Sequence, residues 1–462
     1  MWERSHSVAL VGTVGAGRVP DNPSGGAGRS AVARVQMGQT GGVRIVMMTA
    51  GSRGDVAPYT GLGAGLVRAG HEVTLAAHGL FEPLVAGSGV RFHPLPVDPR
   101  AELHSARGRG LHRARTGAGK LVRLAAMARG AVDEMTTALV EVARQGEVLL
   151  VGGALGPLGY ALADALSVPA LGLHLQPLHP TGEFPAPVLG VRSLGPVGNR
   201  LGGRAVMASV ELMFSGAVRA LPRHGLAAAD RSRRRRWPVM HGYSELVVPR
   251  PRDWPAGLEV SGYWWPHETG RLSPEVEDFL AAGPPPVFVG LGSATVPDPG
   301  KVSREIVAAL RAAKVRGIVQ RGWAGLDAGG AGAASTRSGG DIGGDDILVV
   351  DEAPHSLLFP RTAAVVHHAG AGTTGAVLRA GVPSVPVPVQ FDAAFWASRL
   401  TALGTAPGAV PLRRLTAGTL AGALRRATGD DSHRERARAL ADRLAQEDGV
   451  APVLAALARP TR

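Results

Sequence analysis

The sequence predicts an α/β protein built from two doubly wound parallel-sheet domains, and three observations lead to this prediction. The chain has 462 residues, more than one hydrophobic core normally supports. Short apolar strands alternate with helices from Val43 onward, which is the pattern of a parallel sheet covered by helices on both faces. The same alternation starts again after residue 270, so we expect a second domain of the same class.

The first half carries the elements of one such domain, each recognised from its apolar period and from the glycine or proline beside it. We expect strands at 43–49, 71–78, 90–96, 147–153 and from 169, and helices at 57–69, 80–87, 121–144, 157–167 and 201–220. Two stretches carry no predicted element, a basic loop at 101–120 and the proline- and glycine-rich segment 176–200.

The second half repeats the pattern. We expect strands at 286–293, 316–322, 346–352, 363–370 and 383–389, helices at 301–314, 354–361, 373–380, 393–403, 416–428 and 432–458, and a glycine-rich loop at 324–344. The predicted domains are therefore 43–250 and 271–462, joined by a linker at 251–270 rich in proline and tryptophan. Residues 1–42 lack sustained periodicity and are expected to be a disordered leader. The last helix is long enough to cross back to the first domain.

Composition excludes several classes of function. The chain has no cysteine, which excludes disulfides, thiolate metal sites and cysteine nucleophiles. Its net charge of +13 comes almost entirely from arginine, and we expect no nucleic-acid partner. No run of 18 apolar residues and no secretion signal is found, so a cytoplasmic location is expected. The arginine run at 233–236 is expected to be solvated surface, with weak peripheral contact to an anionic membrane as the alternative.

The most informative segment is 367–374, His-His-Ala-Gly-Ala-Gly-Thr-Thr, where an apolar strand ends and a helix begins. Free backbone N–H groups and the positive end of the helix dipole attract an anion at such a junction. Glycine lets a phosphate approach closely, and the threonine hydroxyls and an imidazole supply further donors. A diphosphate would satisfy all of these groups, whereas the alternative is a glycine turn with two incidental histidines.

The run 351–404 around this segment resembles the donor-binding signature of the UDP-glycosyltransferase superfamily, closest to its sterol glucosyltransferase-like and glycopeptide-antibiotic glycosyltransferase-like branch. Further matches lie in the family's order at 48–78, 249–255, 261–265, 287–293 and 320–323, an order that coincidence rarely gives. The resemblance implies a GT-B architecture, two Rossmann-like domains facing each other across a cleft. It also implies inverting transfer of a hexose from a UDP- or TDP-sugar to a hydroxyl of an apolar acceptor, such as a sterol, a lipid or a natural product.

The resemblance assigns the residues that hold the donor diphosphate. His368 matches the family histidine that bonds a phosphate, and Ser293, after a strand and a glycine, matches another phosphate contact. The backbone and hydroxyl donors around the diphosphate correspond to Gly370, Gly372, Thr373 and Thr374.

Contacts to the nucleoside and the sugar are implied in the same way. His355 lies where the family contacts the ribose and Ala353 where its backbone meets the base, whereas Glu352 replaces a base-stacking tryptophan of plant members. Uridine and thymidine therefore both stay open. Asp392 corresponds to the acidic half of an Asp/Glu–Gln pair that holds sugar hydroxyls, a role that suits a carboxylate because it accepts two hydroxyl hydrogens at once. Ala393 stands where the family has Gln, so the sugar stays open too, and the alternative role of Asp392 is a helix N-cap.

Asp55 is the predicted catalytic base. It lies in the loop that leaves the first strand at the carboxyl edge of a parallel sheet, where ligands normally bind. The acceptor hydroxyl must lose its proton as it attacks the anomeric carbon, and a positioned carboxylate contributes on the order of 10² to 10⁴ in rate as the base. Ser52, Arg53 and Gly54 of the same loop are expected near the phosphates. The alternative role of Asp55 is to cap the helix that follows.

No cofactor or metal is expected in the reaction. No Asp-x-Asp pair is placed to hold Mg²⁺, so the helix terminus and His368 would meet the charge on the departing diphosphate. His174 and His179 are candidates for an alternative base or for Zn²⁺ ligands. Because no carboxylate stands at ligand spacing from them, no metal site is predicted.

Two other functions are weighed against the transferase. A catalytically impaired auxiliary protein of the same fold is the main alternative, because Ala369, Ala371 and Ala393 depart from the commoner family residues. An oxidoreductase of the Rossmann type is disfavoured, since its first turn should read G-x-G-x-x-G and this turn reads AGSRGD.

Overall fold

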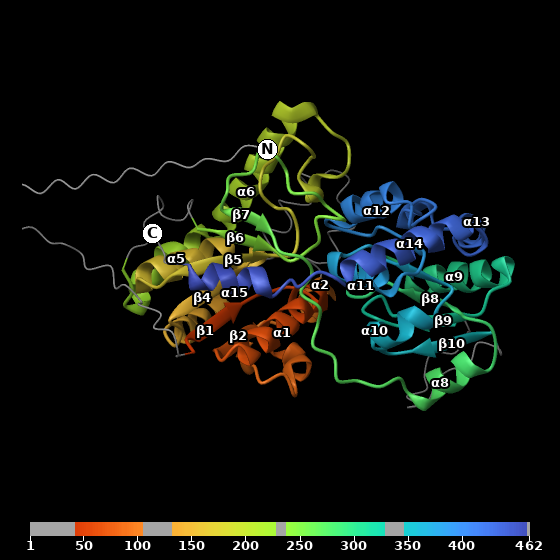
Figure 1. Ribbon diagram of the computed structural model, residues 1–462, viewed down its shortest axis with the longest axis horizontal. Coiled ribbons are helices and arrows are strands. Elements are labelled where there is room, and N and C mark those ends of the chain that lie inside the picture. The colour runs from red at the N-terminus through yellow and green to blue at the C-terminus, as the bar shows by residue number, and fades with distance from the viewer. Residues whose placement is uncertain (1–41, 105–131, 228–236, 329–345, 460–462) are drawn as a thin grey trace, which may run out of the picture. The chain divides into compact units, whose positions relative to one another are not determined.

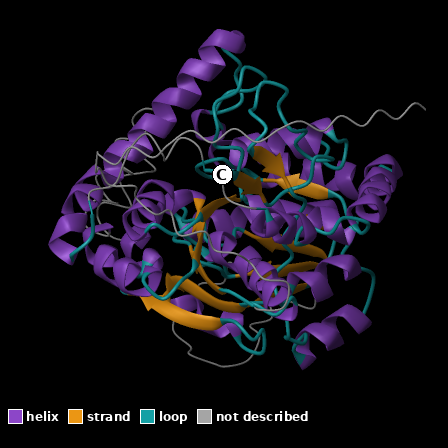
Figure 2. Cartoon of the chain, turned by 60° about the vertical axis from the view of Figure 1, so that its left-hand side comes forward, coloured by secondary structure: helices purple, strands orange, loops and turns teal. Residues whose placement is uncertain are grey.

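The computed structural model describes residues 42–104, 132–227, 237–328 and 346–459, and residues 37–462 form one compact unit. The predicted leader, most of the basic loop 101–120, the arginine run 233–236 and most of the glycine-rich loop 324–344 lie outside the described residues. The described strands form two parallel sheets with helices on both faces of each (Figures 1 and 2). The predicted class, two doubly wound α/β domains, is confirmed.

The first half is a parallel sheet with the strand order β3-β2-β1-β4-β5-β6-β7. Its strands are β1 (Arg44–Met48), β2 (Glu72–His78), β3 (Arg91–Leu95), β4 (Val148–Gly152), β5 (Ala170–His174), β6 (Val239–His241) and β7 (Leu258–Val260). Its helices are α1 (Arg53–Arg68), α2 (Pro99–His104), a helix over 132–143, α5 (Gly156–Leu166) and α6 (Gly195–Ala220). Where a helix was predicted at 80–87, the chain forms the 3₁₀ segment η1 (Gly79–Val85), which contains a proline.

Strand β1 shows how the first sheet is covered on both faces. Ile45 and Met47 pack with the apolar residues of α1, whereas Val46 and Met48 pack with the helix over 132–143, α5 and α6. Successive side chains of a strand point to opposite faces, so a strand that is apolar throughout must be covered on both. This explains why VRIVMMT has no polar alternation.

The strands β6 and β7 were not predicted, and β7 extends the first sheet beyond the predicted domain limit at residue 250. Each has only three residues, which is too short to show a period of two. The prediction treated 251–270 as linker because of its prolines and tryptophans. In the structure part of that segment adds the outermost strand of the first sheet instead.

The second half is a parallel sheet with the strand order β10-β9-β8-β11-β12. Its strands are β8 (Val287–Gly290), β9 (Gly317–Gln320), β10 (Ile347–Val350), β11 (Ala364–His367) and β12 (Ser384–Pro386). Its helices are α8 (Pro274–Ala281), α9 (Pro299–Ala313), α10 (His355–Leu358), α11 (Ala371–Ala380), α12 (Ala393–Ala402), α13 (Ala417–Gly429), α14 (Asp431–Leu444) and α15 (Ala451–Ala458). The apolar stripe of α9 packs on one face of the sheet with α13, through Val302, Ile306, Val307 and Leu310.

The single helix predicted at 432–458 is two helices, α14 and α15, separated at 445–450. The break lets α15 leave the second half, and its Val453 and Leu457 are buried in the core of the first sheet. The Trp264 indole N–H donates to the Gly449 carbonyl at 2.9 Å and fixes the crossing. A Cβ at Gly449 would lie 2.3 Å from the Tyr263 carbonyl oxygen, so the close approach requires glycine.

Among the described residues, one helical segment, Gly195–His224, is long and apolar enough to cross a membrane by length and composition. It comprises α6 and the 3₁₀ turn that follows. Phe214 and Ala217 pack into the core of the first half with α5, whereas Leu194, Val197 and Leu201 are more than half exposed. The helix therefore has one face in the fold and apolar side chains outside it.

Candidate active site

Both sheets have a point at which the strand order reverses, between β1 and β4 in the first and between β8 and β11 in the second. Such points leave a crevice at the carboxyl ends of the strands, where α/β proteins bind ligands. Asp55 lies in the first turn of α1, directly after β1, and the segments after β8 and β11 hold Ser293 and His368. The topology therefore places predicted site residues at the ligand-binding edge of each sheet.

These edges line one cavity of about 1970 Å³, larger than the roughly 300 to 1,000 Å³ of a pocket for one small molecule. Of the predicted site residues, the following line it: Ser52, Arg53, Gly54, Asp55, Ser293, Ala353, His355, His368, Gly370, Gly372, Thr373 and Asp392. Thr374 does not, because its side chain is fully buried within the fold and its amide bonds the Gly370 carbonyl. Its role as a donor to the diphosphate therefore stays a prediction.

Asp55 caps α1 and lines the cavity at the same time. Its Oδ2 accepts the Ser52 N–H at 2.8 Å and the Ser52 hydroxyl at 3.0 Å, and Ser52 is the N-cap residue of the helix. Burial raises the pKa of Asp55 above its ordinary value, against hydrogen bonds from Ser52 and Gln176 that lower it. The cap fixes the direction of the carboxylate, and the raised pKa makes it a stronger base toward a hydroxyl group.

Two glycines make room for the His368 ring. A Cβ at Gly370 would lie 2.4 Å from its Nε2, and a Cβ at Gly292 would lie 2.9 Å from its Cε1. Burial lowers the pKa of His368 to about 4, so the ring is neutral and offers one N–H and one lone pair. Its buried Nδ1 has no hydrogen-bond partner among the described residues. A neutral imidazole beside the N-terminus of α11 is suited to donate to an anion.

Two site-adjacent residues hold left-handed backbone conformations without being glycine. Ala369 has φ 61° and Phe391 has φ 54°, next to His368 and Asp392 respectively. Each conformation costs on the order of 1 to 2 kcal/mol, and such strain tends to gather at functional sites. His367 supports the first of these turns, since its buried Nδ1 accepts the Ala369 amide at 3.2 Å. The other left-handed non-glycine positions in the described part of the chain are ordinary C-caps of α5 and α9.

The loop after β10, which holds the predicted nucleoside contacts, lines another part of the cavity. The His355 ring stacks on Phe359 with centroids 4.3 Å apart, and burial, followed by the charge of Arg53, lowers its pKa to about 3. The Arg53 Nη1 donates to Glu352 Oε2 at 2.7 Å and so joins the loop after β1 to the second half. Both partners are about half exposed or more, and exposed pairs of this kind contribute little. Arg53 is therefore free to exchange this carboxylate for a phosphate.

Asp392 is the N-cap residue of α12, but its side chain makes no capping bond. Its Oδ2 accepts the Trp396 indole N–H at 2.7 Å instead. Burial, followed by the charge of Asp55, raises the pKa of Asp392 to about 6, against the bond from Trp396 that lowers it. Ala393 is 3% exposed and belongs to a hydrophobic cluster, so this position serves packing.

Three amides that line the cavity were not predicted from the sequence, Gln176, Gln320 and Gln390. Gln320 is the last residue of β9 and Gln176 follows β5 by two residues, so the carboxyl end of a strand was the signal for both. Gln390 precedes Asp392 by two residues. Gln390 provides a side-chain amide beside Asp392, the kind of group that is missing at position 393.

The arrangement can perform a two-sided reaction. The second half offers His368 and the N-terminus of α11 to a diphosphate, and the first half offers the Asp55 carboxylate to a hydroxyl. Fixed hydrogen-bond donors stabilise the negative charge that develops on a phosphate leaving group. A positioned base removes the proton of the attacking hydroxyl. Together they allow direct transfer of a group without a covalent enzyme intermediate.

Comparison with known protein families matches both halves of the chain. The model of the glycosyltransferase family 28 N-terminal domain matches residues 45–143. The model of the erythromycin biosynthesis protein CIII-like C-terminal domain matches residues 333–457. The matched ranges contain Asp55 in the first half and the segment 367–374 in the second.

Relatives that align with most of the chain are also glycosyltransferases. O-mycaminosyltylonolide 6-deoxyallosyltransferase of Streptomyces fradiae is 37% identical over 88% of this chain and 95% of its own length. Sterol 3-beta-glucosyltransferase UGT80A2 of Arabidopsis thaliana is 31% identical over 88% of this chain and 64% of its own length. The chain thus spans just under two thirds of the plant protein.

Solved structures share the fold at low sequence identity. The glycotransferase of kitacinnamycin has a TM-score of 0.63 at 18% identity, covering 90% of this chain and 98% of that chain. Glycosyltransferase VinC in complex with DTDP has a TM-score of 0.60 at 20% identity, with the same coverage. The architecture is therefore GT-B. The chain belongs to the UDP-glycosyltransferase superfamily, as a nucleotide-sugar glycosyltransferase related to sterol glucosyltransferases and bacterial natural-product glycosyltransferases.

Proposed function

We propose that this protein transfers a hexose from a UDP- or TDP-sugar to a hydroxyl of an apolar acceptor, with inversion at the anomeric carbon and Asp55 as the base. One observation carries the proposal. Asp55 from the first half and His368 from the second line the same cavity, which has room for two substrates. A base on one wall and an anion site on the other is the arrangement that direct displacement requires.

In the proposed reaction the donor diphosphate lies against the N-terminus of α11, with His368 and Ser293 as further donors. Asp392 and Gln390 orient the sugar hydroxyls. The acceptor oxygen attacks the anomeric carbon from the side opposite the diphosphate, so the configuration inverts, and its proton passes to Asp55. The helix terminus and the imidazole stabilise the charge that develops on the departing diphosphate.

The acceptor wall supports an apolar substrate. Val206, Met207, Val210, Met213 and Phe214 of α6 line the first-half side of the cavity, and apolar linings with few polar groups are typical of small-molecule sites. The relatives named above act on a sterol and on a glycosylated tylonolide, both of which are large hydroxylated apolar molecules. The solved complex of VinC with DTDP supports a TDP-sugar as an alternative to a UDP-sugar as the donor.

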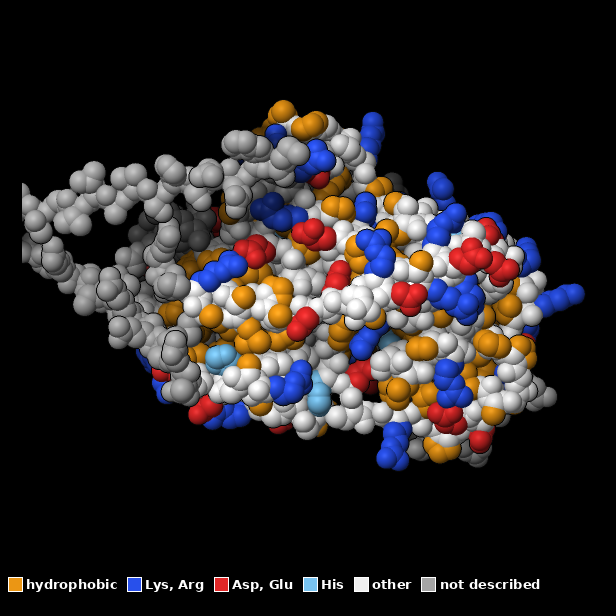
Figure 3. All heavy atoms as spheres, in the orientation of Figure 1, with side chains coloured by type: hydrophobic (Ala, Val, Ile, Leu, Met, Phe, Trp, Pro, Cys, Tyr) orange, Lys and Arg blue, Asp and Glu red, His pale blue; other side chains and the backbone are white. Residues whose placement is uncertain are grey.

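A weak peripheral contact with a membrane is proposed for α6. Leu194, Val197 and Leu201 are between 56% and 69% exposed along one side of its first turns, and Arg200 and Arg204 lie beside them. Apolar and basic side chains on one helix favour the interface of an anionic bilayer. Basic side chains are otherwise spread among acidic ones on the face seen in Figure 3. Co-sedimentation with anionic vesicles should fall when Val197 and Leu201 are replaced by Ser.

The transfer is tested by incubating the purified chain with UDP- and TDP-hexoses and a panel of sterols, macrolide aglycones and other hydroxylated lipids. Mass spectrometry should find an acceptor with one added hexose, and NMR of the product should show the anomeric configuration opposite to that of the donor. Nucleotide binding without turnover of any pair would favour the auxiliary protein instead.

A further inference from the structure

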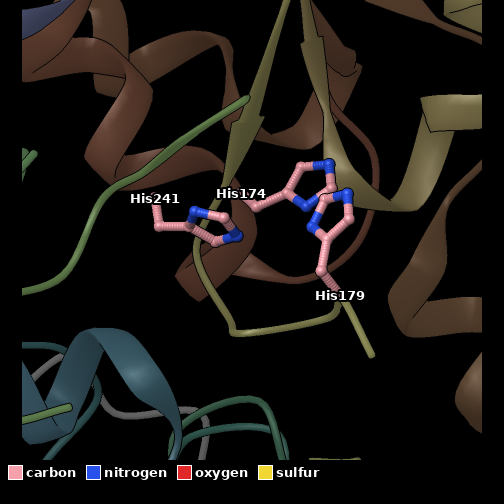
Figure 4. A group of neighbouring side chains, drawn as sticks. All are labelled: His174, His179 and His241. Atoms are coloured by element: carbon pink, nitrogen blue, oxygen red, sulfur yellow. The ribbon is translucent and has the colours of Figure 1, made fainter. Parts of the chain in front are cut away.

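Three histidines meet in the first half, away from the donor residues. His174 is the last residue of β5 and His241 the last of β6, and the two are register partners in neighbouring parallel strands. His179 follows in the segment after β5. Figure 4 shows the three rings gathered in one place. One ring nitrogen of each lies within 4.8 Å of the others, close enough for the three side chains to share one ion.

The ring nitrogens in this cluster lack partners. Both nitrogens of His174, Nδ1 of His179 and Nε2 of His241 are buried without a hydrogen bond within the described part of the chain. Buried polar atoms are normally satisfied, so a group of them facing one another indicates a missing common partner. The cluster also lies at the ligand-binding edge of the sheet, and His174 and His179 line the cavity.

His241 shows the geometry that a metal ligand needs. Its Nδ1 lies 2.8 Å from the Glu259 carbonyl oxygen, and because a carbonyl can only accept, Nδ1 carries the hydrogen. The lone pair is then on Nε2, the nitrogen that faces the cluster. Metal-bound histidines characteristically donate their other N–H to a backbone carbonyl or carboxylate in this way.

Aromatic packing is the competing explanation, because His241 stacks on Trp254 with centroids 4.5 Å apart. Packing alone does not account for the unpartnered nitrogens, because a phenyl ring would fill the same space and has no nitrogens to satisfy. If the histidines serve packing alone, a His-to-Phe replacement should leave metal binding unchanged. If they bind a metal ion, the same replacement should weaken metal binding.

We propose that His174, His179 and His241 form a binding site for a Zn²⁺-like divalent transition metal, with a fourth coordination position open toward the cavity. Three imidazoles suit zinc, whose sites with three protein ligands keep one position for water or a substrate oxygen. No site was predicted from the sequence, because no carboxylate stands at ligand spacing from His174 and His179. The third ligand comes from β6, which the sequence pattern did not reveal.

The test uses the full-length, untagged chain stripped of metal with a chelator. Calorimetry and elemental analysis should find one high-affinity Zn²⁺ per chain, and binding should raise the melting temperature. Co²⁺ should give the intense visible absorption of a tetrahedral site. In His241→Phe and His179→Gln the affinity should fall by more than the roughly 10- to 100-fold that loss of an outer hydrogen-bonding partner costs.

His78→Phe is the matched control, because His78 is buried, lines the same cavity and lies outside the cluster. It should bind Zn²⁺ as the wild type does. If His241→Phe fails to fold by circular dichroism, the half-buried loop variant His179→Gln decides the question. Absence of stoichiometric Zn²⁺ binding by the wild type, or equal binding by the wild type and the folded cluster variants, overturns the proposal. Since the readouts are metal content and melting, this outcome is independent of transferase activity.

Discussion

The charge of Asp55 raises the pKa of Asp392, although one residue follows β1 in the first sheet and the other begins α12 in the second half. The interaction couples the two halves of the cavity. A substitution of Asp55 should therefore shift the titration of Asp392, which neither residue's local sequence suggests.

Asp55→Asn should lower the rate of transfer on the order of 10²- to 10⁴-fold, because the acceptor loses its base. Nucleotide affinity should change little, since Asp55 belongs to the opposite half from the donor residues. The Asn carbonyl oxygen can still accept from Ser52, so the cap of α1 should largely persist and the melting temperature should report this. Transfer at the wild-type rate would remove Asp55 from the mechanism.

Asp392→Asn should stabilise the fold at neutral pH. The ordinary pKa of 3.8 is raised to about 6 in the folded chain, so the ionised form is less favourable there than in the unfolded chain. This contribution is favourable below about pH 4 and is lost as the pH rises through 6. Melting temperatures between pH 4 and 8 should show that loss in the wild type and less of it in the variant. Identical pH profiles would contradict the assigned pKa.

In the same experiment Asp55→Asn should shift the Asp392 transition to lower pH, because one of the causes that raise its pKa is gone. The shift can be followed by the pH dependence of melting or by carboxyl NMR signals. A transition at unchanged pH would mean that the two carboxyl groups are not coupled.

His368→Ala should weaken donor binding and slow the chemical step together, since the ring is assigned both to the bound diphosphate and to the charge it gains. Removal of one such donor typically costs on the order of 10² to 10³ in rate. His93→Ala, at a histidine of β3 that does not line the cavity, is the control and should match the wild type. Unchanged donor affinity and single-turnover rate in His368→Ala would exclude the phosphate role.

Gly370→Ala should reproduce much of that loss while leaving His368 in place. The new Cβ would lie 2.4 Å from the ring's Nε2, so the imidazole must move away from the start of α11. The φ of Gly370 is −72°, which alanine adopts without strain, so stability should change little. Gly418→Ala, where nothing lies within 4 Å of the new atom, controls for the substitution itself and should retain activity.

The sequence predicted correctly the place of those residues whose position follows from local structure. His368 and Gly370 lie at a strand-to-helix junction, and Asp55 lies at the end of the first strand, so a parallel sheet must bring them to its carboxyl edge. Thr374 shows the limit of this reasoning. Consecutive helix residues point about 100° apart, so Thr373 faces the cavity while Thr374 faces the core.

The rest of the site depends on contacts between distant segments. His241 joins His174 only because two strands become neighbours, and β6 with three residues leaves no periodic signal. The coupling of Asp55 to Asp392 depends on the packing of the two halves, which no motif encodes. The left-handed conformations of Ala369 and Phe391 could not be predicted either. Glycine in a sequence indicates a possible positive φ, whereas alanine and phenylalanine do not.

The proposed reaction depends on a pyrophosphate site at the junction from His368 to Thr373. Isothermal titration of the intact chain with UDP and with TDP probes this site without an acceptor. At least one of the two nucleotides should bind saturably with one site per chain, and its affinity should be clearly weaker in His368→Ala. If neither nucleotide binds the folded wild-type chain, the junction is not a pyrophosphate site.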